Sequence, residues 1–259
     1  MTDIVDAGTA YLQDARARRV AVGRFSELRP ELNIDDAYAI QNRLGANRLA
    51  NGETIIGAKL GLTSRAKQVQ MSVNEPLYGQ LYSGCVHPSD APIVVSELIH
   101  PRVEPEIVFV MGQDVRGPGV TGADIIAATR GVTCGLEIID SRYADFSFTA
   151  ADVVADNTSE ARIITGPSLV PADSLDLALV GLLLEVDGDI VATAAGAACM
   201  GHPADAVAMF ANFLATRGEY IKAGWIIFSG GLTAAVPLNP GTSIRASYGH
   251  LGSVGVRGI

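Results

Sequence analysis

The chain has 259 residues, of which 48% are hydrophobic and 18% charged, and its formal net charge is −9. This composition excludes an intrinsically disordered chain, because the apolar fraction is large enough to build a sizeable core. It also makes nucleic acid and anionic membrane surfaces poor partners, because an acidic protein offers no basic footprint for phosphates. The length allows one large unit or one core with a smaller appended element. We expect the latter, with a small molecule as the ligand.

The cysteine pattern and the apolar stretches indicate the cellular compartment in which the protein is expected. Cys85, Cys134 and Cys199 are far apart and form no C-x-x-C pair, so the sequence predicts buried free thiols rather than disulfides or a zinc site. The first residues lack the basic and apolar regions of a secretory signal. The longest apolar stretch is interrupted by Asp176 and Glu185 and is too short to span a bilayer. We therefore expect a cytoplasmic protein with no membrane partner.

The N-terminal part of the chain has helical periodicity. A first helix is indicated by Tyr11, Ala15 and Val20. A second helix begins after the capping residue Asn33, ends at Asn51-Gly52 and carries apolar residues at helical spacing, namely Ala37, Ile40, Leu44 and Leu49. We place a soft boundary near residue 53, between a helical N-terminal part (1–53) and one compact mixed β core (54–259).

From residue 54 the hydrophobic pattern becomes that of strands. Strands are predicted at residues 54–59, 105–111, 133–139, 162–165, 177–186, 225–229 and 244–248. Two further helices are predicted at residues 123–129 and 203–216. Because these helices do not alternate strictly with the strands, the pattern favours an α+β mixed sheet over a doubly wound fold.

One glycine-rich segment matches a dinucleotide-binding fingerprint only superficially. Residues 117–122 read Gly-Pro-Gly-Val-Thr-Gly, but residues 112–116 separate them from the preceding strand. In the true fingerprint the glycine turn leaves the strand directly. Thr121 and Asp124 instead have the spacing of a helix capping box. The sequence also contains no P-loop, no nucleophile elbow and no closely spaced histidine pair, which argues against the corresponding chemistries.

Two carboxylates, Glu104 and Glu106, lie on one predicted strand. Residues two apart on a strand share a face, so the two side chains project together. A hard divalent cation between them would relieve their repulsion, and oxygen-only ligands select Mg²⁺ or Mn²⁺. A solvated edge strand would explain the same spacing and would also tolerate Pro105. The spacing by itself leaves both interpretations open.

Two more charged side chains, Glu137 and Lys59, lie in otherwise apolar strands. A buried charge without a partner is costly, so each of them needs one. Glu137 is a candidate for a third oxygen ligand of the cation, and a salt bridge to Arg142 or another base is the alternative. The sequence does not identify the partner of Lys59.

Several segments, in the same order, resemble the hydratase/decarboxylase family of meta-cleavage pathways, which belongs to the fumarylacetoacetate hydrolase superfamily. The segments are residues 57–64, Glu104 with Glu106, and residues 136–142, 153–159 and 229–233. The resemblance covers nearly the whole chain beyond residue 33. It implies a mixed β-sandwich roll of the fumarylacetoacetate hydrolase C-terminal type with a small helical N-terminal part.

The resemblance also implies the residues of an active site. Mg²⁺ or Mn²⁺ is expected to be held by three glutamates, namely Glu104, Glu106 and Glu137. Lys59 is expected to be the active-site lysine. The expected substrate contacts are Ser159, Thr233 and Leu62. Whether Arg142 and Asp140 belong to the site is left open.

Two activities occur within the resembled family, the decarboxylation of 4-oxalocrotonate and the hydration of 2-hydroxypenta-2,4-dienoate. Three segments favour decarboxylation. Residues 76–79 read Pro-Leu-Tyr-Gly at a loop where the hydratases resemble one another in Asp-Phe-Gly, so the acid expected to assist water addition is missing. Residues 141–146 look like the decarboxylase version of a segment that has tryptophan in hydratases. Residues 207–212 also lack the tryptophan of the hydratases.

The resemblance further implies partners. We expect a small 2-oxo dicarboxylate as substrate, a homo-oligomer, and a companion hydratase that receives the unstable dienol product. A third hypothesis, from another class, is a catalytically silent protein that binds 2-oxo acids.

Overall fold

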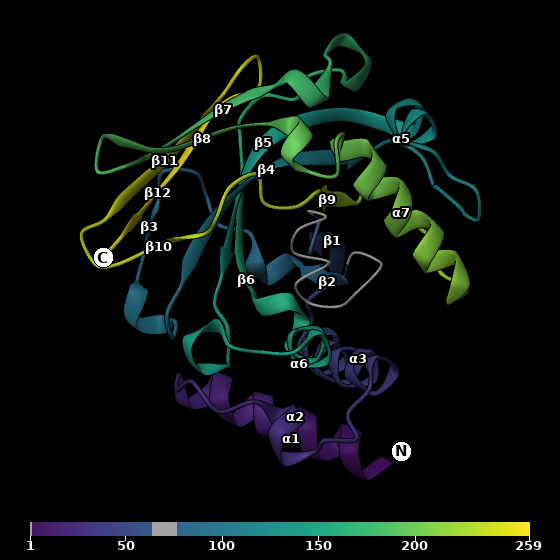
Figure 1. Cartoon of the computed structure of the whole chain (residues 1–259), viewed down its shortest axis with the longest axis vertical. Coiled ribbons are helices and arrows are strands. Elements are labelled where there is room, and N and C mark those ends of the chain that lie inside the picture. Colours follow the sequence, from purple (N-terminus) through teal and green to yellow (C-terminus); the bar gives the residue numbers. More distant parts are fainter. Residues whose placement is uncertain (1, 64–76) are drawn as a thin grey trace.

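The N-terminal helices lie together at one end of the molecule, next to the N-terminus in Figure 1. The computed structural model describes residues 2–63 and 77–259. Its α-helices are α1 (Thr2–Arg18), α2 (Phe25–Leu28), α3 (Ile34–Ala50), α5 (Gly122–Ala128), α6 (Ala150–Ala155) and α7 (Pro203–Thr216). The four predicted helices correspond to α1, α3, α5 and α7, whereas the short helices α2 and α6 are too brief to show a period.

Helix α3 begins where its cap predicts. Asn33 Oδ1 accepts a hydrogen bond from the Asp36 backbone N at 2.9 Å, which satisfies one of the free N–H groups at the helix start. Ile40 is fully buried, but Leu49 is 44% exposed, so the apolar stripe is shorter than predicted. Helix α1 ends before Val20, which was predicted to be helical and is instead an exposed residue beyond the helix.

The described strands form two sheets. The larger sheet has the order β2-β1-β9-β4-β5-β6, with β10 paired to β4, and the smaller has the order β3-β12-β11-β7-β8. The strands of the larger sheet are β1 (Ile55–Gly61), β2 (Leu77–Tyr82), β4 (Arg102–Met111), β5 (Thr129–Ile139), β6 (Glu160–Thr165), β9 (Ile226–Phe228) and β10 (Val236–Pro237). Those of the smaller sheet are β3 (Pro92–Ile93), β7 (Gly181–Val186), β8 (Asp189–Ala195), β11 (Ser243–Tyr248) and β12 (Gly252–Gly258).

The two sheets pack against each other through β5 of one and β11 and β12 of the other. Helix α7 packs on α5 and β1, whereas α3 packs on α6 and β2, so both groups of helices contact the β1–β2 end of the larger sheet (Figure 1). Strand β1 pairs antiparallel with β2 and parallel with β9, so the sheet is mixed. The expected α+β class, with a mixed β-sandwich roll and a helical N-terminal part, is confirmed.

Some strands differ from the prediction. The predicted strand over residues 177–186 is wrong at its start, because Leu177–Leu179 forms a 3-10 turn and β7 begins at Gly181. The Asp176 side chain stabilises this turn by accepting a hydrogen bond from the Ala178 backbone N at 3.1 Å. Residues 77–79, where a loop is expected, belong to β2, while Pro76 and Ser64 lie outside the described residues.

Several smaller expectations hold. Thr121 and Asp124 form the predicted capping box at the start of α5, so the glycine-rich segment before it is a helix entry. The three cysteines are buried and free. Among the described residues, no helix combines the length and apolar character needed to cross a bilayer. The division at residue 53 stays a prediction, since α3 packs closely on α6 and β2 of the following part.

Candidate metal centre and substrate pocket

Glu104 and Glu106 lie on β4, in the middle of the larger sheet. The neighbours of β4 are β9 and β5, so β4 is not an edge strand. The side chain of Glu106 is fully buried and that of Glu104 is partly buried. The alternative of a solvated edge strand is therefore excluded, and the two carboxylates need another explanation.

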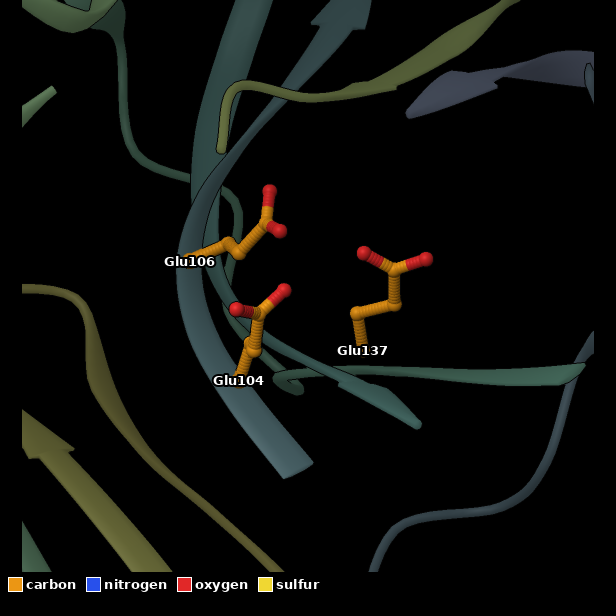
Figure 2. A group of neighbouring side chains, drawn as sticks. All are labelled: Glu104, Glu106 and Glu137. Atoms are coloured by element: carbon orange, nitrogen blue, oxygen red, sulfur yellow. The ribbon is translucent and has the colours of Figure 1, made fainter. Parts of the chain in front are cut away.

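Glu137 lies on β5 directly opposite Glu104 in the antiparallel ladder. Carboxylate oxygens from Glu104, Glu106 and Glu137 lie within 4.8 Å of one another. Figure 2 shows the three side chains directed toward a common space in front of the sheet. Like charges at this separation repel strongly, so the cluster is stable as three anions only with a cation among them.

The surroundings of these carboxylates leave acceptor atoms unused. The Gly230 backbone N donates to Glu106 Oε2 at 2.6 Å. Within the described residues, Oε1 of Glu106 and Oε1 of Glu137 accept no hydrogen bond although both atoms are buried. Buried oxygens without a donor are costly unless a cation or water occupies the space between them. The three oxygen donors therefore fit a hard divalent cation such as Mg²⁺ or Mn²⁺.

The titration of the cluster reflects the same crowding of negative charge. Burial, followed by repulsion from Glu137, raises the pKa of Glu106 well above its ordinary value. Burial also raises the pKa of Glu137 to about 7, although the Lys59 ammonium opposes the rise. These directions belong to the site without a cation, and a bound cation would favour the ionised carboxylates.

Within the described residues, Lys59 on β1 is a positive charge that faces the cluster. Its Nζ lies 3.0 Å from Glu137 Oε2 and donates to the Thr158 carbonyl at 3.0 Å. Burial lowers the pKa of Lys59, but Glu137, Glu104 and Glu106 together raise it by more, so the net pKa is raised. The buried Lys59 ammonium therefore has the carboxylate partner that was expected for a charge in an apolar strand. Glu137 pairs with Lys59 rather than with Arg142.

The turn that carries Thr158 has an uncommon backbone. Asn157, Thr158 and Ser159 have φ values of 49°, 51° and 62°, which places three consecutive residues other than glycine in the left-handed region. Such conformations cost energy and persist where the surroundings hold them. This turn aims the Thr158 carbonyl at Lys59 and places Ser159 in the wall of the pocket.

The backbone conformation and close packing at position 230 require glycine. Its φ is +119°, and a Cβ at this position would be 1.8 Å from Thr63 Oγ1. Only glycine combines this conformation with such a close neighbour. The Gly230 N–H thereby reaches Glu106, so the resembled segment at residues 229–233 contributes a backbone donor rather than a side chain.

A pocket of about 120 Å³ opens beside the glutamates. One end is polar, with Lys59, Glu104, Thr158 and Ser159. The remaining wall is mainly apolar and includes Leu62, Leu77, Ile139, Phe146, Phe148 and Val153. The pocket therefore joins a polar end for an anionic group to an apolar space.

The three expected substrate contacts differ in their positions. Leu62 and Ser159 line this pocket. Thr233 does not line it, and its hydroxyl donates to the Ala234 carbonyl at 3.0 Å. The substrate-binding roles of all three residues stay predictions.

The sequence leaves the roles of Arg142 and Asp140 open. In the structure both side chains bind backbone groups near the site. Arg142 is buried and forms an ion pair with Asp156, and its Nη2 donates to the Asp156 carbonyl at 2.6 Å. Asp140 accepts backbone N–H groups from Ile99 and His100 at 2.8–3.0 Å, just before β4 begins. Both residues fix backbone segments that lead into the site.

A second, larger cavity of about 310 Å³ lies between the N-terminal helices and the turn after α6. Its lining includes Arg48 and Arg142, which are paired with Glu53 and Glu160 and with Asp156, respectively. Because these charges are already balanced and the glutamate cluster is not part of the lining, we assign the chemistry to the smaller pocket.

Sequence reasoning missed the backbone groups of the site. The Thr158 carbonyl and the Gly230 N–H contact Lys59 and Glu106. Every residue type carries these atoms, so no residue signal marks them. The resemblance pointed to both segments, and the glycine pair at residues 230–231 was the visible sign of a tight approach.

This arrangement is matched by a known family. Residues 54–257 match the model of the fumarylacetoacetate (FAA) hydrolase C-terminal family. The match covers well over half of the chain, so the chain belongs to this family.

Individual relatives refine the comparison. The 4-oxalocrotonate decarboxylase of Pseudomonas sp. (strain CF600) is 45% identical over 230 residues, which are 89% of this chain and 87% of that relative. The 2-keto-4-pentenoate hydratase of Paraburkholderia xenovorans (strain LB400) is 38% identical over 225 residues, or 87% of this chain and 84% of that relative. The solved structure of 4-oxalocrotonate decarboxylase from Pseudomonas putida G7, complexed with magnesium and adipate, has a TM-score of 0.97 and 42% identity, and covers 100% of this chain and 98% of its own.

Proposed function

We propose that this protein is a metal-dependent carboxy-lyase that converts 4-oxalocrotonate (2-oxohex-3-enedioate) into 2-hydroxypenta-2,4-dienoate and CO₂, a step in the degradation of aromatic compounds. The observation that carries the proposal is the buried cluster of three glutamates and Lys59 at the polar end of an apolar pocket. It is supported by relatives named 4-oxalocrotonate decarboxylase, one of them in complex with magnesium and the dicarboxylate adipate.

Glu104, Glu106 and Glu137 would hold the cation, for which we propose Mg²⁺ or Mn²⁺. The fit rests on their oxygen-only donor set and on the buried oxygens of Glu106 and Glu137 that lack donors among the described residues. When bound, the cation supplies Lewis acidity toward the 2-oxo acid end of the substrate. The three carboxylates also give it a fixed position against the sheet.

The reaction needs a sink for one electron pair. When the bond between carbon 5 and the departing carboxylate breaks, its electrons move through the alkene to the 2-oxo oxygen, and a dienolate and CO₂ result. Lys59 is fixed between Glu137 and the Thr158 carbonyl, so it can add positive charge near that oxygen or transfer a proton. Each tenfold gain in rate requires about 1.4 kcal/mol of such stabilisation. No covalent bond between Lys59 and the substrate is needed.

The apolar wall of the pocket would contact the carbon chain of the substrate. Phe148, Val153 and Leu77 are part of this wall. It would hold the chain that lies between the two carboxylates of the substrate.

Hydration of 2-hydroxypenta-2,4-dienoate is the alternative, because a hydratase relative is 38% identical to this chain. The absence of Asp-Phe-Gly at residues 76–79 argues against it. The two activities are separated by assaying the pure protein on both substrates side by side. CO₂ release from 4-oxalocrotonate supports the proposal, and consumption of the dienoate alone overturns it. Oxalate and metal binding without turnover of either substrate would mean a silent binding protein.

Chelation and one substitution test the cation. EDTA is expected to abolish CO₂ release, and Mg²⁺ or Mn²⁺ is expected to restore it. Glu106→Gln is expected to stay inactive with either metal, because it removes a charged ligand, while the exposed Glu97→Gln serves as the matched control. Activity that survives thorough chelation would contradict the role of the three glutamates.

We also propose that the dienol product passes to a companion hydratase and that the protein forms a homo-oligomer. The product is unstable, so direct transfer would limit its loss. Light scattering of the pure protein measures the oligomer, and co-purification with a hydratase from the same source tests the complex. The expected cytoplasmic location stays a prediction.

A further inference from the structure

Arg102 lies on the same face of β4 as the metal-binding glutamates. It precedes Glu104 by two residues, so strand alternation directs both side chains to one side of the sheet. In the ladder between β4 and β5, Glu104 is opposite Glu137, and Arg102 is opposite Ile139. The Arg102 pair is therefore the next pair on this face, roughly 7 Å along the strands from the glutamate pair.

The Arg102 guanidinium lies against a wall of the substrate pocket. Its Cζ is 4.1 Å from the centroid of the Phe146 ring. Phe146 and Ile139 line the same pocket as Lys59 and Glu104. The pocket thus extends from the glutamates to the aromatic ring that carries the guanidinium.

The position of the Phe146 ring is fixed by the local backbone conformation and by a neighbouring ring. Its φ is 53°, after Asp145 at 57°, and a bulky residue rarely adopts this conformation. The ring of His100 also packs against the Phe146 ring, with the two ring centroids 4.7 Å apart. His100 is itself fixed by a hydrogen bond between Nε2 and the Ser141 carbonyl at 2.7 Å. The strained turn therefore holds the ring against Arg102.

The charge of Arg102 is not balanced within the described residues. No carboxylate in residues 2–63 and 77–259 forms an ion pair with it, whereas the buried Arg142 is paired with Asp156. A guanidinium that stacks on a ring still has its N–H edge available for two parallel hydrogen bonds to a carboxylate. The chemistry of this position therefore fits a carboxylate ligand.

The substrate has a carboxylate at a matching distance. Five carbon–carbon bonds of about 1.5 Å separate the two carboxylate carbons of a six-carbon dicarboxylate, which gives roughly 6 Å in the extended form. This length is close to the spacing of the two residue pairs on the strands. With its 2-oxo acid end at the glutamates, the substrate can reach Arg102 with its other end.

We propose that Arg102, supported by Phe146, binds the distal carboxylate of a dicarboxylic 2-oxo acid and so selects dicarboxylates over monocarboxylates. The inference rests on the proposed function for the placement of the 2-oxo acid end. The distal carboxylate is the group that leaves as CO₂, and its negative charge declines as the bond breaks. Arg102 therefore stabilises the bound substrate more than the transition state, and its loss should raise KM more than it lowers kcat.

The test compares two ligands that differ only in the distal carboxylate, 2-oxoadipate and 2-oxohexanoate. Their Kd values are measured by calorimetry on the Mg²⁺-loaded protein. For Arg102→Met, we expect binding of 2-oxoadipate to weaken about 10- to 100-fold, the effect of a lost charge-assisted pair. Binding of 2-oxohexanoate should stay nearly unchanged. The exposed Arg130→Met, on β5, removes the same charge away from the pocket and should leave both Kd values unchanged.

Equal weakening of both ligands, or no weakening of either, would overturn the inference. Phe146→Leu provides a second variant that keeps Arg102, and it should weaken 2-oxoadipate selectively but less. The proposed function can fail separately. If wild-type protein releases no CO₂ but binds 2-oxoadipate through Arg102, only the function is wrong. If Arg102→Met releases CO₂ with an unchanged KM, only the role of Arg102 is wrong.

Discussion

Two buried ionic clusters lie on either side of the turn Asn157–Ser159, and they differ in charge balance. The glutamate cluster places three carboxylates, those of Glu104, Glu106 and Glu137, near the Lys59 ammonium. The arginine cluster pairs Arg142 with Asp156 and Arg48 with Glu160. In the second cluster each guanidinium has a carboxylate, so the protein satisfies its own charges. Among the described residues, the first cluster sets three carboxylates against one ammonium, and a bound cation would neutralise the excess negative charge.

The difference teaches that burial of charge does not by itself mark a functional site. Arg142 and Asp156 are as deeply buried as the glutamates, but they hold backbone, because Arg142 Nη2 bonds to the Asp156 carbonyl. On the other side of the turn the Thr158 carbonyl accepts from Lys59. The arginine cluster thus holds the turn in position. The same turn supplies the Thr158 carbonyl that accepts from Lys59. The following changes separate the two roles.

The largest expected effect is on activity. Glu137→Gln should lower kcat/KM by roughly a thousandfold or more, about 4 kcal/mol of transition-state stabilisation, because it removes a proposed metal ligand and the partner of Lys59. The metal-free variant should be no less stable than wild type, because a neutral amide replaces a carboxyl whose pKa is raised and because Glu104 and Glu106 still face the buried Lys59 ammonium. Steady-state kinetics and urea denaturation in EDTA measure the two effects. A large loss of stability would place Glu137 with the structural cluster.

Substitutions in the arginine cluster should lower the stability of the protein. Asp156→Asn leaves the buried Arg142 without a counter-charge, so the free energy of unfolding should fall by about 3 kcal/mol. The double variant Arg142→Met/Asp156→Leu removes both charges and should recover most of that stability. Denaturation curves check both variants. If Asp156→Asn were as stable as wild type, the pair would not hold the turn.

The smallest expected effect is the pH dependence of metal stabilisation. Glu137 has a pKa of about 7 in the folded metal-free protein, above its ordinary value, so the folded form binds extra protons below that pH. The stability of the metal-free protein should therefore decline as pH rises through about 7. Mg²⁺ needs the ionised carboxylates, so the stabilisation it gives should grow over the same range.

Thermal unfolding with and without Mg²⁺ measures this dependence. At a free Mg²⁺ concentration of about one hundred times Kd, the gain should be about 2.7 kcal/mol near pH 8, and it should shrink toward pH 5.5. Glu137→Gln should lose most of this gain, whereas Arg142→Met/Asp156→Leu should keep it. A gain that does not change with pH would contradict the raised pKa of the cluster.

Local sequence pattern was enough to predict part of this protein. Strand alternation placed Glu104 and Glu106 on one face, the isolated charges of Glu137 and Lys59 predicted that both need partners, and Thr121 with Asp124 predicted a helix start. The pattern failed where geometry depends on other segments. The first half of strand β2 falls where a loop is expected, and the seven-residue strands β8 and β12 are not predicted.

Only the tertiary structure determines which charged side chains contact one another. Lys59 and Glu137 lie on β1 and β5, which are not neighbours in the sheet, and the structure brings them to 3.0 Å. That approach makes Lys59, rather than Arg142, the partner of Glu137. It also brings the Thr158 carbonyl to Lys59 as an acceptor and the Gly230 N–H to Glu106 as a donor. A residue's own periodicity determines the face on which it lies, because alternation is a property of one strand. The strand it faces is determined by long-range packing of the whole core.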